Sequence, residues 1–367
     1  MKSKVTVELD DRSYDISVIT GVEVSHFEAV IEKGRMVLIL SDSNVDPLYG
    51  DKVEKMIKEC GSKTVRMVVP AGEKSKCLAT AEKVYEKCVS SGLDRKSYIV
   101  ALGGGMIGDL AGFISATFLR GIRFIQVPTT LLAMVDSSVG GKTGVNLASG
   151  KNMVGVFHQP SAVLTDLSML TTLANREYIS GMAEVVKYGI IWDSTLFRKI
   201  EDNVDAILKR ETGLLAEIIA RCCEIKAEVV AVDEREAGVR AILNLGHTFG
   251  HALEQLTGYS ALLHGEAISI GMVFAVRLSV LEKGFKDSDA ARVEALLSKL
   301  GLPTGMSAVK QKYSLAQIGT AMEADKKSVN KIPKFVLVHS IGEALFGCDV
   351  KLDDLKTAYG LIGGGSK

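Results

Sequence analysis

The sequence predicts an α/β domain followed by a mainly α-helical domain. Short apolar runs alternate with helical patterns in the first half, helical patterns dominate the second half, and a glycine-rich turn joins a predicted strand to a helix after Gly103. Strands separated by helices of this length are typical of βαβ units with a mostly parallel sheet. We expect the α/β domain to span residues 1–170 and the helical domain residues 171–367.

Four buried strands are predicted in the first half, because each is a short apolar run closed by residues that commonly end a strand. They are Met36–Leu40, Val65–Val69, Tyr98–Leu102 and Phe124–Val127. Between the second and third, Lys76–Val89 carries apolar residues at helical spacing.

Six helices are predicted in the second half from apolar periodicity and from residues that favour helices. They are Ile179–Ile191, Leu196–Glu211, Leu214–Val232, His247–Leu256, Glu266–Lys283 and Ala290–Leu300. A late apolar run, Phe335–Val338, predicts one strand near the end of this domain.

Composition gives no support to several classes of protein, although a local basic pocket is compatible with it. The 367 residues carry 44 basic and 44 acidic side chains, so net charge gives no argument for nucleic acid or a membrane surface as a partner. We find neither the apolar stretch of a signal peptide at the start nor a run of ~18 apolar residues that would span a membrane. The six cysteines form no CxxC pair, which indicates reduced, mostly buried thiols in a cytoplasmic protein.

The glycine-rich turn is a candidate dinucleotide site. Gly103-Gly104-Gly105-Met106-Ile107-Gly108-Asp109 follows a predicted strand and matches GxGxxG. Glycines let backbone approach a phosphate, and a helix N-terminus offers unpaired N–H groups to an anion. The acidic ribose ligand expected ~20 residues downstream is missing, so Asp42, at the end of an earlier strand, is the better candidate. A tight turn without a ligand is the alternative.

A second glycine motif, Gly140-Gly141-Lys142-Thr143, resembles the end of a phosphate-binding P-loop. That motif requires glycine at the position where Asp136 stands. A Walker-type ATP site is therefore not predicted.

Histidines and a glutamate form a candidate metal site. His247 and His251 are four residues apart on a predicted helix and so share one face, and His264 precedes the next helix. Glu184 lies on an earlier helix, three residues before Lys187. Glutamate with two histidines leaves one position on zinc open, as in catalytic sites. The spacing alone leaves open which two of the three histidines bind.

The other histidines, His26, His158 and His339, are interpreted as hydrogen-bonded structural residues. The motif HExxH is absent, which argues against a zinc protease.

Polar residues in apolar surroundings predict a pocket for an anion. Between Arg120 and Asn152 they are Arg120, Thr129, Thr130, Asp136, Lys142, Asn146, Lys151 and Asn152. Arg240 and Asn244 lead directly to His247 and are candidates for a second anion contact beside the metal. Lys226, on the preceding helix, is a further candidate. For any single lysine, a solvated surface position is the alternative.

Several segments, in family order along most of the chain, closely resemble the 3-dehydroquinate synthases. They are residues Gly103–Pro160, Ser180–Gly189 (SGMAEVVKYG), Asn244–Glu254 (NLGHTFGHALE), His264–Met272 (HGEAISIGM) and Asp325–Lys327. The resemblance implies an N-terminal Rossmann-like NAD-binding α/β domain and a mainly α-helical, metal-binding C-terminal domain, usually in a homodimer.

The resemblance also implies roles for individual residues. Glu184, His247 and His264 would hold Zn²⁺, with Co²⁺ as an alternative metal. NAD would contact Asp42, Asn44, Gly72, Glu73, Lys74, Lys76, Gly104, Gly105, Met106, Ile107, Gly108, Asp109, Thr129, Thr130, Lys142 and Lys151. Catalytic roles would fall to Lys142, Lys187, His251, Arg120 and Asn152. Further substrate contacts would come from Asp136, Lys226, Arg240, Asn244 and Lys334.

The implied reaction converts 3-deoxy-D-arabino-heptulosonate 7-phosphate into 3-dehydroquinate and phosphate, a step of the shikimate pathway to aromatic amino acids. NAD would be reduced and reoxidised in each cycle. The alternatives are another sugar phosphate cyclase, of the 2-deoxy-scyllo-inosose or valiolone type, and a metal-dependent polyol dehydrogenase. A non-catalytic ligand-binding protein is a third, which the intact metal and cationic motifs argue against.

Overall fold

The structure, a computed structural model, describes residues 2–259, 261–324 and 333–365. The chain divides into two compact units. One comprises Met1–Leu173 and Thr212–Glu234 and is called the α/β unit; the other comprises Ala174–Glu211 and Arg235–Lys367 and is called the helical unit. The sequence expectation placed all of residues 171–367 in one domain, whereas Thr212–Glu234 groups with the α/β unit.

The α/β unit is built on a seven-stranded sheet with the strand order β1-β2-β9-β6-β5-β3-β4. β1 is antiparallel to β2, and the other neighbours are parallel. The strands are β1 (Lys2–Val7), β2 (Tyr14–Ile19), β3 (Met36–Asp42), β4 (Lys63–Val69), β5 (Tyr98–Gly103), β6 (Arg123–Pro128) and β9 (Ala162–Asp166). The four predicted strands and the mostly parallel sheet are confirmed; β1, β2 and β9 were not predicted.

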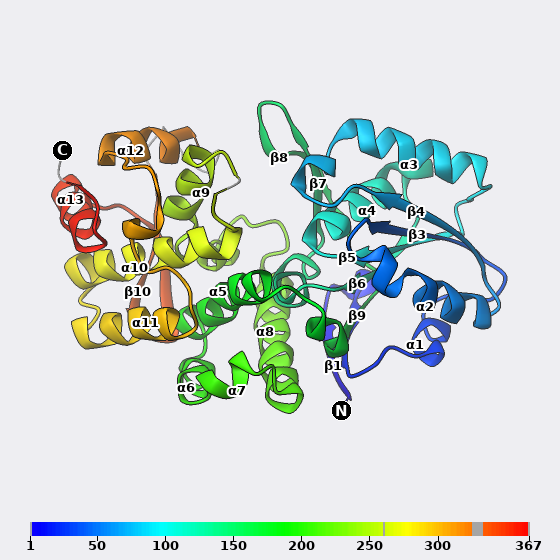
Figure 1. Cartoon of the computed structure of the whole chain (residues 1–367), viewed down its shortest axis with the longest axis horizontal. Coiled ribbons are helices and arrows are strands. Elements are labelled where there is room, and N and C mark those ends of the chain that lie inside the picture. The colour runs from blue at the N-terminus through cyan, green and yellow to red at the C-terminus, as the bar shows by residue number, and fades with distance from the viewer. Residues whose placement is uncertain (1, 260, 325–332, 366–367) are drawn as a thin grey trace. The chain divides into compact units, whose positions relative to one another are not determined.

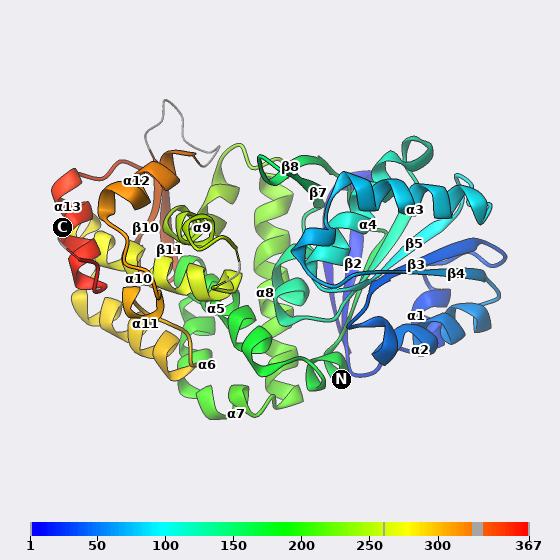
Figure 2. The ribbon, with the colours of Figure 1, turned by 45° about the horizontal axis from the view of Figure 1, so that its top comes forward.

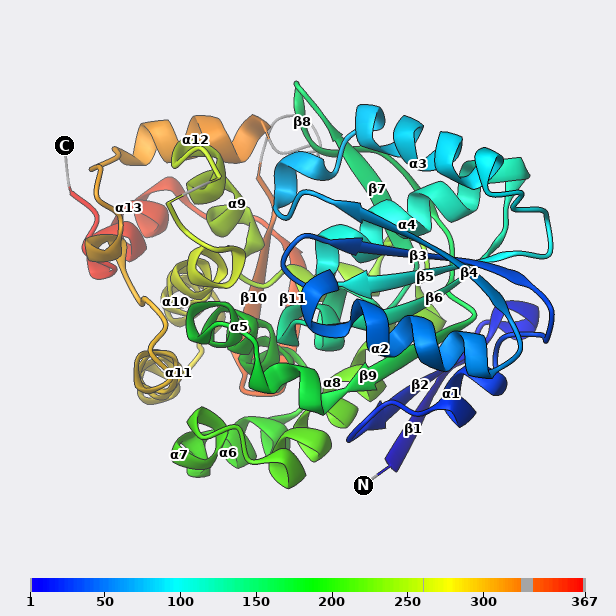
Figure 3. The same cartoon turned by 45° about the vertical axis from the view of Figure 1, so that its right-hand side comes forward.

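Helices cover both faces of this sheet, as Figures 2 and 3 show for α1 and α2 on one side and α3 and α4 on the other. They are α1 (Val24–Glu28), α2 (Asp46–Glu59), α3 (Leu78–Ser90) and α4 (Gly105–Thr117). Leu38 and Leu40 of β3 share a core with α3 and α4, and the alternate residues Val37 and Ile39 are also fully buried. Burial on both faces explains why these strands are continuous apolar runs.

Two further elements complete the α/β unit. α8 (Thr212–Val232) packs against β1 and β2, which accounts for its place in this unit. The hairpin of β7 (Lys142–Leu147) and β8 (Gly150–Phe157) packs on α4. The packing is close: a Cβ on Gly112 of α4 would lie 2.3 Å from Cγ2 of Thr143.

The helical unit surrounds α10 (His264–Lys283), which packs against α5, α9, α11, α13 and β10 (Figure 1). Its other elements are α5 (Asn175–Ile191), α6 (Ser194–Asp202), α7 (Val204–Leu208), α9 (His247–Leu256), α11 (Asp287–Lys299), α12 (Leu315–Ala324), α13 (Leu352–Leu361), β10 (Phe335–Ser340) and β11 (Glu343–Cys348). Within the described residues, α10 has the length and apolar character of a membrane span, but 72% of that window is buried in the protein.

One segment predicted as a single helix forms two helices. Leu196–Glu211 divides into α6 and α7 at Asn203, whose φ of −126° and ψ of 26° leave the helical region. The Asn203 side-chain amide donates to the carbonyl of Lys199 at 2.8 Å, so it satisfies a backbone group at the end of α6. The other predicted helices and the late strand are confirmed.

The structure confirms that most of the cysteines are buried free thiols and that the three isolated histidines are hydrogen-bonded. All six cysteines are free thiols, and four of them are buried. Rings of His26, His158 and His339 each form a hydrogen bond with nearby backbone.

Candidate active site

Three helices of the helical unit bring Glu184, His247 and His264 together. Glu184 lies inside α5, whereas His247 and His264 are the first residues of α9 and α10. Gly246 caps α9 in a left-handed conformation with φ of 80°, which favours glycine. A Cβ on Gly265 would lie 1.8 Å from the carbonyl oxygen of Ser180, so glycine lets the start of α10 touch α5.

The three side chains form a compact set of possible metal ligands. Nε2 of His247 lies 3.8 Å from Oε1 of Glu184, and Nε2 of His264 lies 3.7 Å from the same oxygen. All three ligand atoms lie within 4.8 Å of one another. Glu184 is fully buried, and the ammonium of Lys187, one helical turn later, contacts its other carboxylate oxygen. Burying a carboxylate requires positive charge nearby, which Lys187 supplies and a metal ion would increase.

Hydrogen bonds at the far side of each ring orient the two imidazoles. Nδ1 of His247 lies 3.1 Å from the carbonyl oxygen of Leu245, and Nδ1 of His264 lies 3.2 Å from Oε2 of Glu254. Because a carbonyl can only accept, His247 donates its Nδ1–H there. Both Nε2 atoms therefore face Glu184, the arrangement that metal-binding histidines commonly show.

The two imidazoles have opposite electrostatic surroundings. Burial lowers the pKa of His264, but hydrogen bonds and charge from Glu184 and Glu254 outweigh it and raise this pKa to about 10. The pKa of His247 is lowered well below its ordinary value by burial and by the cation of Lys187. A donor set of one carboxylate and two imidazoles fits a divalent ion such as zinc.

His251 belongs to a second, overlapping group. It forms a possible ligand set with Glu254 and His264, again with ligand atoms within 4.8 Å. Its ring lies edge-on to that of His247 with centroids 5.2 Å apart. The two sets share His264, so the structure brings all three predicted histidines to one place.

The predicted anion-binding residues of the helical unit lie in several environments. Arg240, in the turn before α9, is 1% exposed. The amide of Asn244 donates to Oε1 of Glu236 at 2.7 Å. Lys334 is exposed and contacts Asp349, while its carbonyl accepts from the hydroxyl of Thr248 in α9 at 3.2 Å. Sequence reasoning missed Glu236 and Glu254; the backbone of Glu236, at φ of 58°, is unusual for a residue other than glycine.

In the α/β unit, predicted cofactor residues gather at the carboxyl ends of three neighbouring parallel strands. Asp42 ends β3, the glycine turn follows β5, and Thr129 follows β6. The chain continues from β3 outward to β4 but from β5 in the opposite direction to β6, so the order reverses between β3 and β5. Ligands of open α/β sheets commonly bind at such a reversal.

The glycine turn is tightly enclosed. A Cβ on Gly104 would lie 3.1 Å from Cγ2 of Thr130, and one on Gly105 would lie 2.8 Å from the hydroxyl of Ser137. The carboxylate of Asp42 accepts hydrogen bonds from the backbone of Asn44 and Val45 at 2.9 and 3.2 Å. The predicted turn from strand to helix is confirmed, because β5 ends at Gly103 and α4 begins at Gly105.

Lys76 is a buried cation in this region. Its Nζ lies 2.9 Å from Oδ2 of Asp109, 3.2 Å from Oε1 of Glu73 and 2.7 Å from Oδ1 of Asn152. Burial lowers the pKa of Lys76, but Asp109 and Glu73 outweigh that effect and raise it. The structure therefore joins three predicted cofactor residues to Asn152, which was predicted to act on the substrate.

The remaining predicted residues of the α/β unit are more dispersed. Lys226 on α8 is buried and lies 2.6 Å from Oδ1 of Asp136. Arg120 is exposed in a bend where it has φ of 67° and Leu119 has φ of 51°. Lys142, at the start of β7, is exposed, and Lys151 on β8 is half-buried. The predicted residues of the loop before α3, Gly72 and Lys74, are exposed as well.

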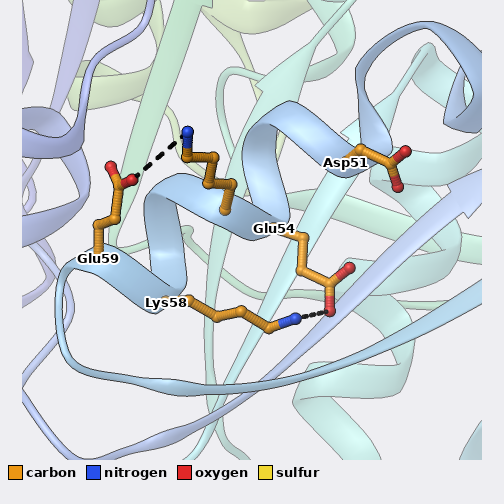
Figure 4. A pocket seen from close by; sticks show the side chains of 5 residues that line it. Asp51, Glu54, Lys58 and Glu59 are labelled. Carbon is orange, nitrogen blue, oxygen red and sulfur yellow. Dashed lines mark ion pairs between the residues drawn. The ribbon is translucent and has the colours of Figure 1, made fainter.

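A hollow on the outer surface of α2 contains none of the predicted residues. It is lined by Asp51, Glu54, Lys55, Lys58 and Glu59 (Figure 4). Lys58 pairs with Glu54 at 2.9 Å, and Lys55 with Glu59 at 3.9 Å, each one helical turn away. Such pairs belong to a solvated helix surface, so the hollow is not a candidate active site.

Comparison with solved structures defines the class of protein. A 2-epi-5-epi-valiolone synthase from Streptomyces hygroscopicus, solved with NAD⁺ and Zn²⁺, is 26% identical with a TM-score of 0.87, covering 97% of this chain and 98% of its own. A 2-deoxy-scyllo-inosose synthase, solved with carbaglucose-6-phosphate, NAD⁺ and Co²⁺, is 25% identical with a TM-score of 0.84, covering 98% and 99%. The fold is that of the sugar phosphate cyclases.

Comparison of sequences is more specific. Models of the N-terminal and C-terminal parts of 3-dehydroquinate synthase match residues 66–180 and 181–328. The 3-dehydroquinate synthase of Pelobacter propionicus is 44% identical over 98% of this chain and 99% of its own length. The chain belongs to the 3-dehydroquinate synthase family.

Proposed function

We propose that the protein converts 3-deoxy-D-arabino-heptulosonate 7-phosphate into 3-dehydroquinate and inorganic phosphate, with NAD and a divalent metal as cofactors. The convergence of both Nε2 atoms of His247 and His264 on buried Glu184 carries the proposal. Identity of 44% to a 3-dehydroquinate synthase over nearly the whole chain supports this substrate over those of the more distant cyclases.

Glu184, His247 and His264 would hold the metal. Ligand atoms at ~2.1 Å from a tetrahedral ion lie ~3.4 Å apart, so the separations of 3.7 and 3.8 Å require only small shifts. Three protein ligands leave a fourth position for the substrate. When bound, zinc would act as a Lewis acid on a substrate hydroxyl or carbonyl. Cobalt is an alternative, since a related cyclase was solved with Co²⁺.

NAD would bind at the strand ends that carry Asp42, the glycine turn and Thr129. The N-terminus of α4, with its free N–H groups, would face the pyrophosphate. The Asp42 carboxylate would accept from a ribose hydroxyl. Bound NAD would accept a hydride from the substrate and later return it, which makes it a recycled catalyst.

The chain's own cations, together with two asparagine amides, would hold the substrate's phosphate and carboxylate. In the helical unit we assign this role to Lys187, Arg240, Asn244 and Lys334. In the α/β unit we assign it to Arg120, Lys142, Asn152 and Lys226, with Asp136 orienting Lys226 through their ion pair. His251, beside the proposed ligands, would contact the substrate or move a proton. Holding one flexible substrate through oxidation, phosphate loss, reduction and ring closure is largely a task of positioning and electrostatics.

We further infer that the protein acts in the cytoplasm, as a homodimer, on a small-molecule substrate. Six free thiols support a reducing compartment. The homodimer is a property that resemblance to the family implies. The molecular mass of the particle in solution, compared with the mass of one chain, tests it.

The test is turnover with a small amount of NAD. The protein is incubated with zinc and 3-deoxy-D-arabino-heptulosonate 7-phosphate while phosphate and NADH are followed. We expect many phosphates per NAD and no lasting NADH. Metal-stripped protein and Glu184→Ala should be inactive, whereas Glu343→Gln, changed at an exposed site on β11, should match the unaltered protein.

Other outcomes would separate the alternatives. Phosphate release only from sedoheptulose 7-phosphate or glucose 6-phosphate would indicate a different sugar phosphate cyclase. NADH that accumulates until the added NAD is used up, without phosphate release, would indicate a dehydrogenase.

A further inference from the structure

Asn146 stands where the regular pairing of the β7–β8 hairpin is interrupted. Val145 pairs with Val154 and Leu147 with Gly150, with a shift of register between them. On the opposite strand the irregular segment contains Asn152, whose φ is 53°. Asparagine tolerates this left-handed conformation better than most residues do. The conformation still requires contacts that stabilise it.

The side chain of Asn146 uses both of its ends. Its Oδ1 accepts a hydrogen bond from the backbone N–H of Asn152 at 2.9 Å, and its Nδ2 donates to Oε1 of Glu73 at 2.9 Å. Its backbone N–H donates to the carbonyl of Lys76 at 2.8 Å. A single residue thus joins the bend at Asn152 to the segment that carries Glu73 and Lys76.

These contacts determine which atoms Asn152 offers. Its Oδ1 lies 2.7 Å from Nζ of Lys76, and an ammonium can only donate. The amide of Asn152 therefore turns its oxygen to Lys76, which makes Nδ2, a donor, the end available to an anion. Lys76 itself is 4% exposed and is held by Asp109 and Glu73.

We propose that Asn146 is a positioning residue that aligns Asn152 for the substrate and Glu73 for the cofactor. The inference rests on the proposed function, since it assigns Asn152 to the substrate and Glu73 to NAD. Asparagine suits this position because one end must accept and the other must donate. An aspartate would keep an acceptor for Asn152 but would face Glu73 with a second carboxylate.

The two halves of the proposal can be tested with different substitutions. In Asn146→Ala both side-chain hydrogen bonds are lost, and we expect kcat at saturating NAD to fall ~10- to 100-fold because Asn152 is displaced. In Asn146→Asp we expect the NAD dissociation constant to rise at least roughly threefold, while kcat at saturating NAD stays close to that of the unaltered protein. NAD affinity is measured by titration calorimetry on zinc-loaded protein without substrate.

A double-mutant cycle separates positioning from general destabilisation. If Asn146 acts through Asn152, adding Asn146→Ala to Asn152→Ala should cost no more than about twofold in kcat at saturating NAD. If the fold loss in kcat of the double variant equals the product of the losses of the two single variants, the proposal is overturned. An Asn146→Asp variant that loses kcat as severely as Asn146→Ala would also overturn it. Asn203→Ala, which removes one amide hydrogen bond in the helical unit, is the control for an ordinary loss of stability.

These outcomes are distinct from failure of the proposed function. Inactivity of the unaltered protein on the heptulosonate phosphate would count against that function, and the calorimetric comparison of Asn146→Asp would still test the contact with Glu73. Unchanged NAD affinity in that variant would overturn this half of the proposal.

Discussion

Glu254 orients His264: its Oε2 lies 3.2 Å from Nδ1 of that ring, on the side opposite to Nε2. Partners of this kind fix the tautomer of a metal-binding histidine, and their loss typically weakens metal binding ~10- to 100-fold. We expect that loss in Glu254→Ala. Glu254→Gln, whose amide oxygen can still accept, should lose less. Zinc affinity is measured by competition with a chelator.

Glu343→Gln is the control for this series, because Glu343 is an exposed glutamate of the same unit. Zinc affinity of Glu254→Ala equal to that of the unaltered protein would show that His264 needs no such partner.

The close approach at Gly265 predicts a position that tolerates no side chain. Its Cβ would lie 1.8 Å from the carbonyl oxygen of Ser180, and this backbone atom of α5 cannot move independently. We expect Gly265→Ala to lower the free energy of unfolding by at least ~2 kcal/mol and to weaken zinc binding by displacing His264. Chemical denaturation and zinc titration measure the two effects.

Gly319 of α12 provides the matched comparison, since a Cβ there would meet nothing within 4 Å. Gly319→Ala should be neutral or stabilising by up to ~1 kcal/mol, because alanine favours helix. Similar destabilisation in both variants would contradict the packing argument.

The pair of Lys187 and Glu184 predicts a stability effect that depends on metal. Both residues are buried, with 1% and 0% exposure. Removing one partner of a buried pair commonly costs ~3 kcal/mol or more, and we expect such a loss for Lys187→Met in metal-free protein. Saturating zinc should recover part of it, because a bound cation stabilises the folded state beside Glu184.

Urea denaturation with and without zinc measures this difference. Lys299→Met, on the exposed surface of α11, should show little change under either condition. If zinc recovers no stability in Lys187→Met, Lys187 and the metal do not share Glu184 as their partner.

His158 predicts a dependence of stability on pH. Burial lowers the pKa of His158 below its ordinary 6.5, although its ring also donates to the carbonyl of Ile122 at 3.1 Å. The unfolded chain therefore binds a proton more readily than the folded protein. The contribution of neutral His158 is complete above pH 6.5 and is lost as the pH falls below it.

The measurement compares the unaltered protein with His158→Gln between about pH 5 and pH 8. On the acid side of this range, the free energy of unfolding of the unaltered protein should fall more steeply than that of His158→Gln. If the difference in free energy of unfolding between the two proteins stays constant with pH, His158 does not cause the pH dependence.

The sequence predicted those elements whose local pattern is strong. β3 and β5 are continuous apolar runs because helices cover both faces of the sheet, and α9 begins at His247 directly after a glycine. The edge strand β1 alternates exposed and buried residues from Lys4 to Val7, a stretch too short to stand out in the sequence, and was missed. The membership of α8 was also missed, since packing against β1 and β2 leaves no local signal.

The candidate site also combines residues that have a local sequence signal with residues that only the tertiary structure identifies. Glu184, His247 and His264 were predicted from residue type, spacing and resemblance, and the structure brings them together. Glu236 and Glu254 were not singled out, because a glutamate at an unexceptional position looks like any solvated one. Their partners, Asn244 and His264, are contacts that only the fold reveals.

The division of the α/β unit into two stretches of chain has a consequence for its synthesis. Thr212–Glu234 belongs to this unit, yet Ala174–Glu211 of the other unit is made first. A nascent chain therefore cannot complete its first unit until α8 has left the ribosome, which at ~5–20 residues per second takes several seconds after β9 emerges. During that interval the surface of β1 and β2 that α8 covers is exposed to chaperones and to other nascent chains.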